Sequence, residues 1–277
     1  MREPTEEEGL PKPFYRDGWT RQQRPIARAL WHFHLALTDP YAPSLDGSDL
    51  TAYFTAERDR VLDAEALKVV PSDVAQDAYA GCAEGRIPIE LLAAQVAASE
   101  TFSRPARFAD SREVKAFVRQ WAGSHARALA HLARATGSWQ LGFADEMATG
   151  LFWVGRLMTL KDDLARDRLF IPLADLEQHG VPLEQLRAGR VDENMKRLLW
   201  KQTIRAKNAF AHCEQLANEV PSRQANALKR WWLGGLEILN EIQRRKFDLW
   251  SEPIELSLRY RLQVRFQARF GRTTFRA

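Results

Sequence analysis

The side chains with the clearest potential for chemistry lie in the segment RLMTLKDDLARDRLFIP, residues 156–172. At the spacing of an α-helix, Thr159, Asp163 and Asp167 fall on one stripe, each one turn from the next. Two or three carboxylates on one face of a core helix are what a protein needs to hold Mg²⁺ against a diphosphate. An ordinary solvated helix face shows the same pattern, so a metal site and a solvated face both remain open at this point.

The helix that carries these carboxylates is expected to pack against a core. Beside the acidic stripe, apolar residues recur at the same spacing: Trp153, Leu157, Leu160 and Leu164. Across the 277 residues, 45% are hydrophobic, Gly (15) and Pro (13) are scarce, and long strand-like alternations are missing. We therefore expect an all-α protein, with a polar disordered segment at 1–13 and a single domain at 14–277. Helices are expected at 25–38, 49–66, 71–82, 88–100, 111–135, 150–164, 192–220, 222–247 and 256–270.

Cysteine content and the N-terminal composition suggest the cellular setting. Cys82 and Cys213 lie far apart without metal-ligand spacing, so both are expected to be reduced and buried. The polar, acidic start MREPTEEEGLPKP is unlike a signal or transit peptide. No apolar run approaches the ~18 residues of a membrane span. A cytoplasmic protein is the expectation, with peripheral attachment to the inner face of the membrane as an open addition.

Several segments, in the right order along the chain, resemble one protein family. RLFIPLADLEQHGV at 168–181 is similar to the R-x-Y-L-P-x-x-x-L-x-x-x-G stretch of the squalene/phytoene synthases. The acidic segment that leads into it resembles the second aspartate-rich motif of that family, N-x-x-x-D-x-x-x-D. The other similar segments are RPIARALWHF at 24–33, IPIELLAAQVAASE at 87–100, AGS at 122–124 and ILNEIQRRKFDLW at 238–250. The resemblance runs from about Arg24 to the C-terminus.

This resemblance implies a fold and a reaction. The fold is an isoprenoid-synthase-type helical bundle around a central cavity. The reaction is the head-to-head condensation of two prenyl diphosphates, in which two facing aspartate motifs hold Mg²⁺ on the leaving diphosphate. Carried over to this sequence, the resemblance makes Asp39, Asp163 and Asp167 the residual metal ligands and diphosphate-binding residues. It adds Arg168 to the substrate-binding residues, and also Phe117, which stands in place of the family's tyrosine-rich pattern.

The motif positions depart from the family pattern. The place of the first motif, D-D-x-x-D, is held by the sequence TDPYA, in which only Asp39 remains and Pro40 disfavours a helix. In the second motif, Thr159 occupies the first aspartate position and Gly155 the place of the asparagine. Each carboxylate lost from a metal site forfeits about 4 kcal/mol of charge interaction at ~4 Å and an effective dielectric of ~20. Losses on both sides of the cavity therefore argue against the family mechanism.

The family resemblance and the incomplete aspartate motifs together leave two functions open. The first is a catalytically impaired protein of isoprenoid metabolism that binds an isoprenoid or another long apolar ligand, or that assists a partner protein. The resemblance offers a precedent, since mitochondrial complex I assembly factors of the family also lack the aspartates. The alternative is an active head-to-head prenyltransferase with a squalene- or phytoene-type product. Mg²⁺ is the expected cofactor in the second case only, and whether the chain is an enzyme stays open.

Histidines and nucleotide-binding motifs add no stronger candidate. His32 and His34 are two residues apart and point in different directions on a helix, so core or boundary positions are expected for them. Ser124 and His125 are adjacent and therefore do not form a nucleophile–base pair. The chain has no glycine-rich phosphate loop and no G-x-S-x-G motif. A nucleic-acid partner is not expected.

The last expected helix combines charge with an apolar stripe. Arg261, Arg265 and Arg269 recur every four residues. A second stripe at the same spacing consists of Leu258, Leu262, Phe266 and Phe270. We expect the Leu/Phe stripe to dock on the domain and the arginines to face solvent, where an anionic membrane surface is a candidate partner. Attachment of this kind would be electrostatic and reversible.

Overall fold

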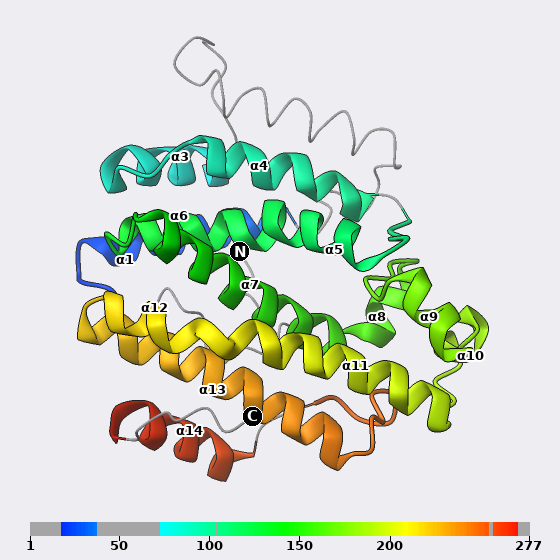
Figure 1. The fold of residues 1–277 in the computed structure, drawn as a ribbon. Helices are drawn as coiled ribbons and strands as arrows, with labels where there is room; N and C mark the ends of the chain where they lie inside the picture. Colours follow the sequence, from blue (N-terminus) through cyan, green and yellow to red (C-terminus); the bar gives the residue numbers. More distant parts are fainter. Residues whose placement is uncertain (1–17, 38–72, 104, 255–256, 271–277) are drawn as a thin grey trace.

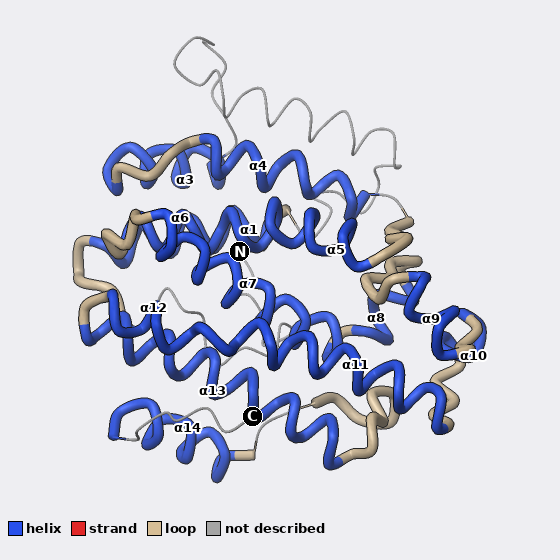
Figure 2. Tube along the Cα trace, viewed as in Figure 1, coloured by secondary structure: helices blue, strands red, loops and turns tan. Residues whose placement is uncertain are grey.

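The computed structural model describes residues 18–37, 73–103, 105–254 and 257–270. The disordered segment expected at 1–13, the expected helix at 49–66 and the candidate ligand Asp39 lie outside these residues. Within them the expected all-α fold is confirmed, because helices and loops account for the backbone and the one bridge between extended residues is isolated, joining Ala106 to Arg168 (Figure 2).

The helices lie in layers with their axes roughly aligned (Figure 1). One outer layer holds α3 (Asp73–Gly85) and α4 (Glu90–Ser99), which cover α1 (Gln23–Ala36), α5 (Ser111–Val118) and α6 (Ser124–Leu132). The short helices α8 (Leu160–Ala165), α9 (Leu173–His179) and α10 (Leu183–Arg187) gather at one end. The remaining helices are α7 (Ser138–Met158), α11 (Glu193–Ala209), α12 (Cys213–Glu219), α13 (Ser222–Arg244) and α14 (Leu258–Phe270). None of the described helices is long and apolar enough to cross a membrane.

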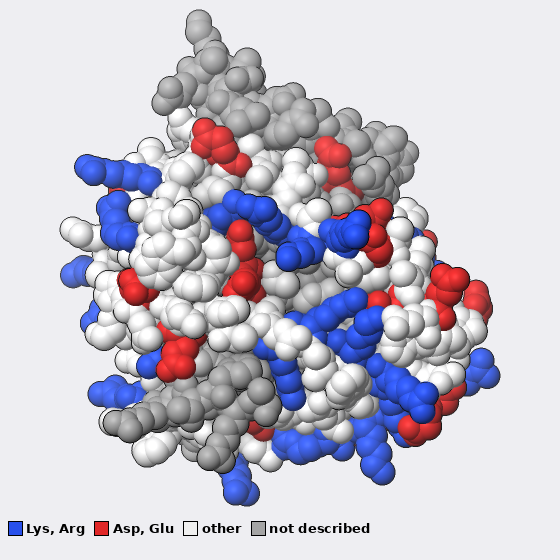
Figure 3. All heavy atoms as spheres, viewed as in Figure 1, with Lys and Arg blue, Asp and Glu red and all other residues white. Residues whose placement is uncertain are grey.

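The helix α7 is the centre of the bundle. It contacts α5 and α6 on one side and α11, α12 and α13 on the other. The apolar stripe expected from the sequence is buried, with Trp153 and Leu157 on α7 and Leu160 and Leu164 on α8. Both cysteines are free and buried, as expected. On the face drawn in Figure 3, basic side chains form a band across the middle and gather again toward the lower right, with acidic side chains scattered among them.

Three of the expected continuous helices are interrupted, and the one expected at 192–220 is divided into α11 and α12 by a 3-10 turn at Phe210–His212. The segment expected at 111–135 is helical as far as Leu132 and contains a π-helical turn at Arg119–Gly123. Its N-cap is Asp110, whose side chain accepts hydrogen bonds from the backbone N–H groups of Arg112 and Glu113. The segment 150–164 is expected as one helix, but α7 ends at Met158 and α8 begins at Leu160, so that Thr159 separates them. The Thr159 hydroxyl, 3.0 Å from the carbonyl oxygen of Gly155, bonds back onto the preceding turn, a contact that bends helices.

One aromatic ring joins the three central helices. Phe210, which follows α11, is fully buried between Gly150 of α7 and Gly235 of α13. A Cβ atom at Gly150 would lie 2.5 Å from this ring, and one at Gly235 would lie 2.9 Å from it. The two glycines therefore provide the space that the ring occupies.

The orientation of α14 differs from the sequence expectation. The stripe expected to dock is the exposed one: Leu258 is 73% exposed, Leu262 54%, and Phe266 and Phe270 66% each. Val264 and Ala268 are buried instead, where α14 packs on α13. Small side chains let two helices approach closely, whereas four large ones would hold them apart. The expectation that the Leu/Phe stripe faces the domain is wrong.

Candidate functional site

The carboxylate of Asp163 is buried and bound by an arginine of its own segment. Only 4% of Asp163 is exposed, and the Arg156 Nη1 atom lies 3.1 Å from Oδ1 and 3.2 Å from Oδ2. The Thr159 hydroxyl lies 3.0 Å from Oδ2. Burial raises the pKa of Asp163, while Arg156 and Thr159 act to lower it by favouring the charged form. Arg156 precedes Asp163 by seven residues, two helical turns, so the spacing alone could have indicated this pair.

Asp167 does not join Asp163. Its backbone φ is +56°, in the left-handed region, because the chain leaves α8 just before it. Its side chain is about half exposed and binds Arg107 and Arg187, the latter at 2.6 Å. These two arginines hold the pKa of Asp167 below its ordinary value. Thr159 and Asp163 thus share a stripe as expected, but Asp167 lies outside it.

Arg168 and Phe117 lie in the core near Asp163. Arg168 is buried, donates to the carbonyl oxygen of Phe102 at 2.6 Å and lies over the Phe102 ring. Phe117 packs in a cluster of rings with Phe102, Phe108, Phe152 and Phe170. The guanidinium of Arg156 lies 5.3 Å from the centre of the Phe170 ring, which places this cluster beside the ion pair. The role of both residues in substrate binding stays a prediction.

The described residues do not fit a Mg²⁺ site. They contain no group of three or more His, Cys, Asp or Glu side chains that could hold a metal ion. An ion at Asp163 would meet the positive guanidinium of Arg156, which already contacts both carboxylate oxygens, and the two cations would repel each other. The metal-binding role of Asp39 stays a prediction.

Arg156 also lines a partly open cavity of about 130 Å³. The walls come mainly from α1, α6, α7 and α13 and from the π-helical turn. They are apolar, with four tryptophans, Trp19, Trp31, Trp121 and Trp231, and several alanines. The polar and charged residues of the lining are His34, His125, Arg156 and Gln224. A lining with few polar groups in an apolar wall is typical of a small-molecule site.

A pair of histidines from two helices forms part of this lining. The rings of His34 and His125 stack with their centres 4.4 Å apart, and His34 also stacks on Trp121. Gln95 lies 2.9 Å from His34 Nδ1. Both ring nitrogens of His125 and the indole Nε1 of Trp31 are buried without a hydrogen-bond partner. Sequence spacing gives no signal for this pair, because 91 residues separate His34 from His125 and only the fold brings them together.

We expect the stability of the protein to fall as the pH drops below about 6.5. Burial lowers the pKa of His34 from 6.5 to about 4, against the raising effect of Gln95 and with a further lowering by Arg156. Burial also lowers the pKa of His125, and His34 adds to this. Between pH 6.5 and 4 the unfolded chain therefore binds more protons than the folded one. The free energy of unfolding falls by about 3 kcal/mol over this range through His34 alone. Urea unfolding at a series of pH values measures this loss.

The double variant His34→Gln/His125→Gln is the control for this pH dependence. Asp163 acts in the opposite sense, since its raised pKa favours proton uptake by the folded state. Removing the histidines should therefore flatten or reverse the slope between pH 6.5 and 5. An unchanged slope in the variant would show that other groups cause it.

Comparison with known proteins agrees with the architecture. The family model for squalene/phytoene synthase matches residues 22–267. A phytoene synthase from Thermus thermophilus is 33% identical over 95 residues, which span 34% of this chain and only 32% of that enzyme. Among solved structures, squalene synthase HpnC from Alicyclobacillus acidocaldarius has a TM-score of 0.73 at 24% identity, covering 83% of this chain and 87% of that one. A dehydrosqualene synthase in complex with ligand has a TM-score of 0.80 at 15% identity, covering 93% and 90%.

The helical bundle around an apolar cavity is therefore an isoprenoid-synthase-type fold, as expected. Because the family model covers most of the chain, this protein belongs to the squalene/phytoene synthase family.

Proposed function

We propose that this protein binds an isoprenoid or another apolar chain in the cavity and does not carry out the Mg²⁺-dependent condensation of two prenyl diphosphates. The observation that carries this proposal is the ion pair of Arg156 with Asp163. A fixed guanidinium neutralises the carboxylate that the family motif would use for metal binding. An accessory role beside a partner protein is compatible with such a binder.

The cavity supports an apolar ligand that carries one polar group. Cavities of roughly 150 Å³ hold a benzene-sized molecule, so the observed 130 Å³ takes one segment of a prenyl chain. A longer chain requires the partly buried side chains in the wall, such as Leu151 and Leu228, to move. The unpartnered nitrogens of His125 and Trp31 can hydrogen-bond to a hydroxyl or phosphate oxygen of the ligand.

Incubation with farnesyl or geranylgeranyl diphosphate and Mg²⁺ tests the loss of catalysis. We expect no C30 or C40 hydrocarbon and no cyclopropyl diphosphate intermediate, as measured by mass spectrometry. A condensed product that disappears in the Asp163→Ala variant would overturn the proposal and establish the active prenyltransferase instead.

A variant that fills the cavity tests ligand binding. Gly155 lies on α7 in the cavity wall, and a Cβ atom there would meet nothing within 4 Å. Gly155→Leu should therefore fold normally and weaken the binding of farnesol or farnesyl diphosphate at least tenfold. Quenching of the tryptophans around the cavity measures the affinity, with and without EDTA.

The matched control is Gly142→Leu. Gly142 lies on the same helix, is exposed, and also has open space around its Cβ position. Both substitutions gain about 1 kcal/mol of helix propensity, so they differ only in whether they fill the cavity. Equal affinity in both variants would place the ligand elsewhere, and an affinity that EDTA abolishes would contradict the metal-free site.

A further inference from the structure

A row of four large apolar side chains projects from α14 into solvent. This ridge consists of Leu258, Leu262, Phe266 and Phe270, each more than half exposed. The rings of Phe266 and Phe270 contact each other, with their centres 5.2 Å apart. Single exposed apolar residues are common on protein surfaces, but a continuous row along one helix marks a site of contact with an apolar partner.

An arginine-rich pocket of about 640 Å³ lies at the same helix. Five arginines line it: Arg24, Arg223, Arg230, Arg265 and Arg269. Among the described lining residues there is no Asp or Glu. A hollow lined by several guanidinium groups is suited to a phosphate-bearing anion.

The chain before α1 forms one wall of this pocket. Gly18 has a φ of +91° and packs directly on α13, where a Cβ atom would lie 2.9 Å from Cβ of Ala227. This close approach holds the segment that leads to Arg24 against the N-terminal half of α13, which carries Arg223 and Arg230. The pocket is therefore formed by three segments that are far apart in sequence.

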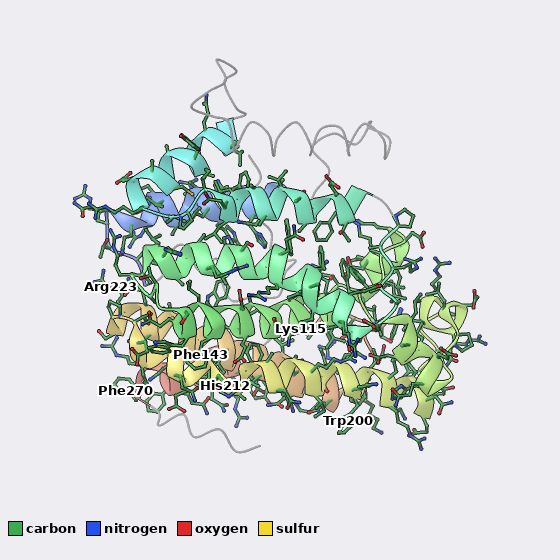
Figure 4. All side chains as sticks on the ribbon, turned by 45° about the horizontal axis from the view of Figure 1, so that its top comes forward. Lys115, Phe143, Trp200, His212, Arg223 and Phe270 are labelled. Carbon is green, nitrogen blue, oxygen red and sulfur yellow. The ribbon has the colours of Figure 1, made fainter. Side chains whose placement is uncertain are left out.

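The ridge and the pocket are neighbours on α14. Val264 and Ala268 face the bundle, and Arg265 and Arg269 follow them by 100° around the helix, at the edge of the pocket. The ridge comes next around the helix, so it borders the arginines directly. In Figure 4, Arg223 and Phe270 lie at the same end of the bundle, whereas Trp200 lies toward the other end.

We propose that this surface docks the protein on a bilayer that contains anionic phospholipid. The ridge enters the boundary between headgroups and acyl chains, and the arginine pocket receives lipid phosphate. The charge of the C-terminal segment supports this partner, since residues 256–277 contain six arginines and no acidic residue. Attachment thus has an apolar component beside the electrostatic one, because the ridge is free to insert.

Vesicle co-sedimentation tests this surface. We expect the protein to bind phosphatidylcholine vesicles that contain phosphatidylglycerol, and to bind pure phosphatidylcholine at least tenfold more weakly. Arg265→Glu/Arg269→Glu should weaken binding at least tenfold, since each arginine near an anionic surface contributes about fivefold and the reversal adds repulsion. Phe266→Ser/Phe270→Ser should also weaken binding at least tenfold, and binding by this variant should be lost completely at high salt.

Matched variants at exposed sites elsewhere test whether a loss of vesicle binding is specific to α14. The alternative is that any equal change in net charge or exposed apolar area has the same effect. Arg112→Glu/Arg197→Glu makes the same charge change on exposed residues of α5 and α11, and Trp200→Ser removes a side chain that is 52% exposed. Both should bind vesicles like the unmodified protein. Equal binding to neutral and anionic vesicles, no binding to either, or equal losses in the matched variants would overturn the proposal. Self-association that Phe266→Ser/Phe270→Ser abolishes, without vesicle binding, would assign the ridge to a second copy of the chain.

Discussion

Replacing Arg156 by methionine should destabilise the protein by about 3–5 kcal/mol, because it leaves the Asp163 carboxylate buried and unpaired. Methionine retains much of the apolar volume of the side chain between Phe152 and Phe170, so the loss reports mainly on the charge. Urea unfolding at pH 7 measures the difference. The double variant Arg156→Met/Asp163→Leu should recover a large part of it, since both charges are then absent.

The exposed ion pair of Asp167 provides the comparison. Arg187 and Asp167 are each nearly half exposed, and Asp167 also binds Arg107. Arg187→Met makes the same chemical change where water can solvate the remaining carboxylate, so the unfolding midpoint should not change measurably. If Arg156→Met is as mild as Arg187→Met, the Asp163 carboxylate has access to another counter-ion, and the argument for a metal-free site fails.

Replacing Phe210 by alanine should cost about 3–5 kcal/mol, as expected for a buried aromatic ring whose removal leaves a cavity. The ring fills the space between Gly150 and Gly235, and neither backbone has a side chain that can relax into the vacancy. The measurement is again urea unfolding. Phe266→Ala is the matched control, since Phe266 is 66% exposed and its truncation should change stability by no more than about 0.5 kcal/mol.

Adding a side chain at Gly150 tests the same close contact between this glycine and the Phe210 ring. Gly150→Ala should destabilise the protein by about 1–3 kcal/mol, because the new methyl group overlaps the Phe210 ring. Phe210→Leu should reduce the cost of Gly150→Ala when the two are combined. Additive effects of the two substitutions would mean that the ring and the glycine do not share this space.

Local periodicity was sufficient to predict the helical fold and the buried stripe from Trp153 to Leu164. It could not predict which side of α14 is buried. The stripe of Leu258 and Phe266 has the stronger apolar signal, yet the smaller Val264 and Ala268 face the bundle. Helical periodicity identifies stripes, whereas packing also depends on how closely two helices can approach, which is a property of the partner as well.

Only those contacts of the candidate site that lie within one helix could be predicted from the sequence. The contact of Thr159 with Asp163 is local and follows from helical spacing. Asp167 leaves the stripe because its own backbone is left-handed just after the end of α8. No glycine at this position signals such a conformation in the sequence. The stacking of His34 on His125 depends on how two helices meet, and spacing within one helix says nothing about it.

The π-helical turn at Arg119–Gly123 affects how relatives of this chain should be aligned. A π-helical turn is wider than an α-helical one and accommodates an extra residue without changing the length of the loops at either end. A homologue without this turn would need a one-residue gap in the middle of a helix, where alignment methods penalise gaps most. A gap placed in the following loop instead would assign every residue from Ser124 to Leu132 to the wrong helical face. The position equivalent to His125 would then be misidentified in every such homologue.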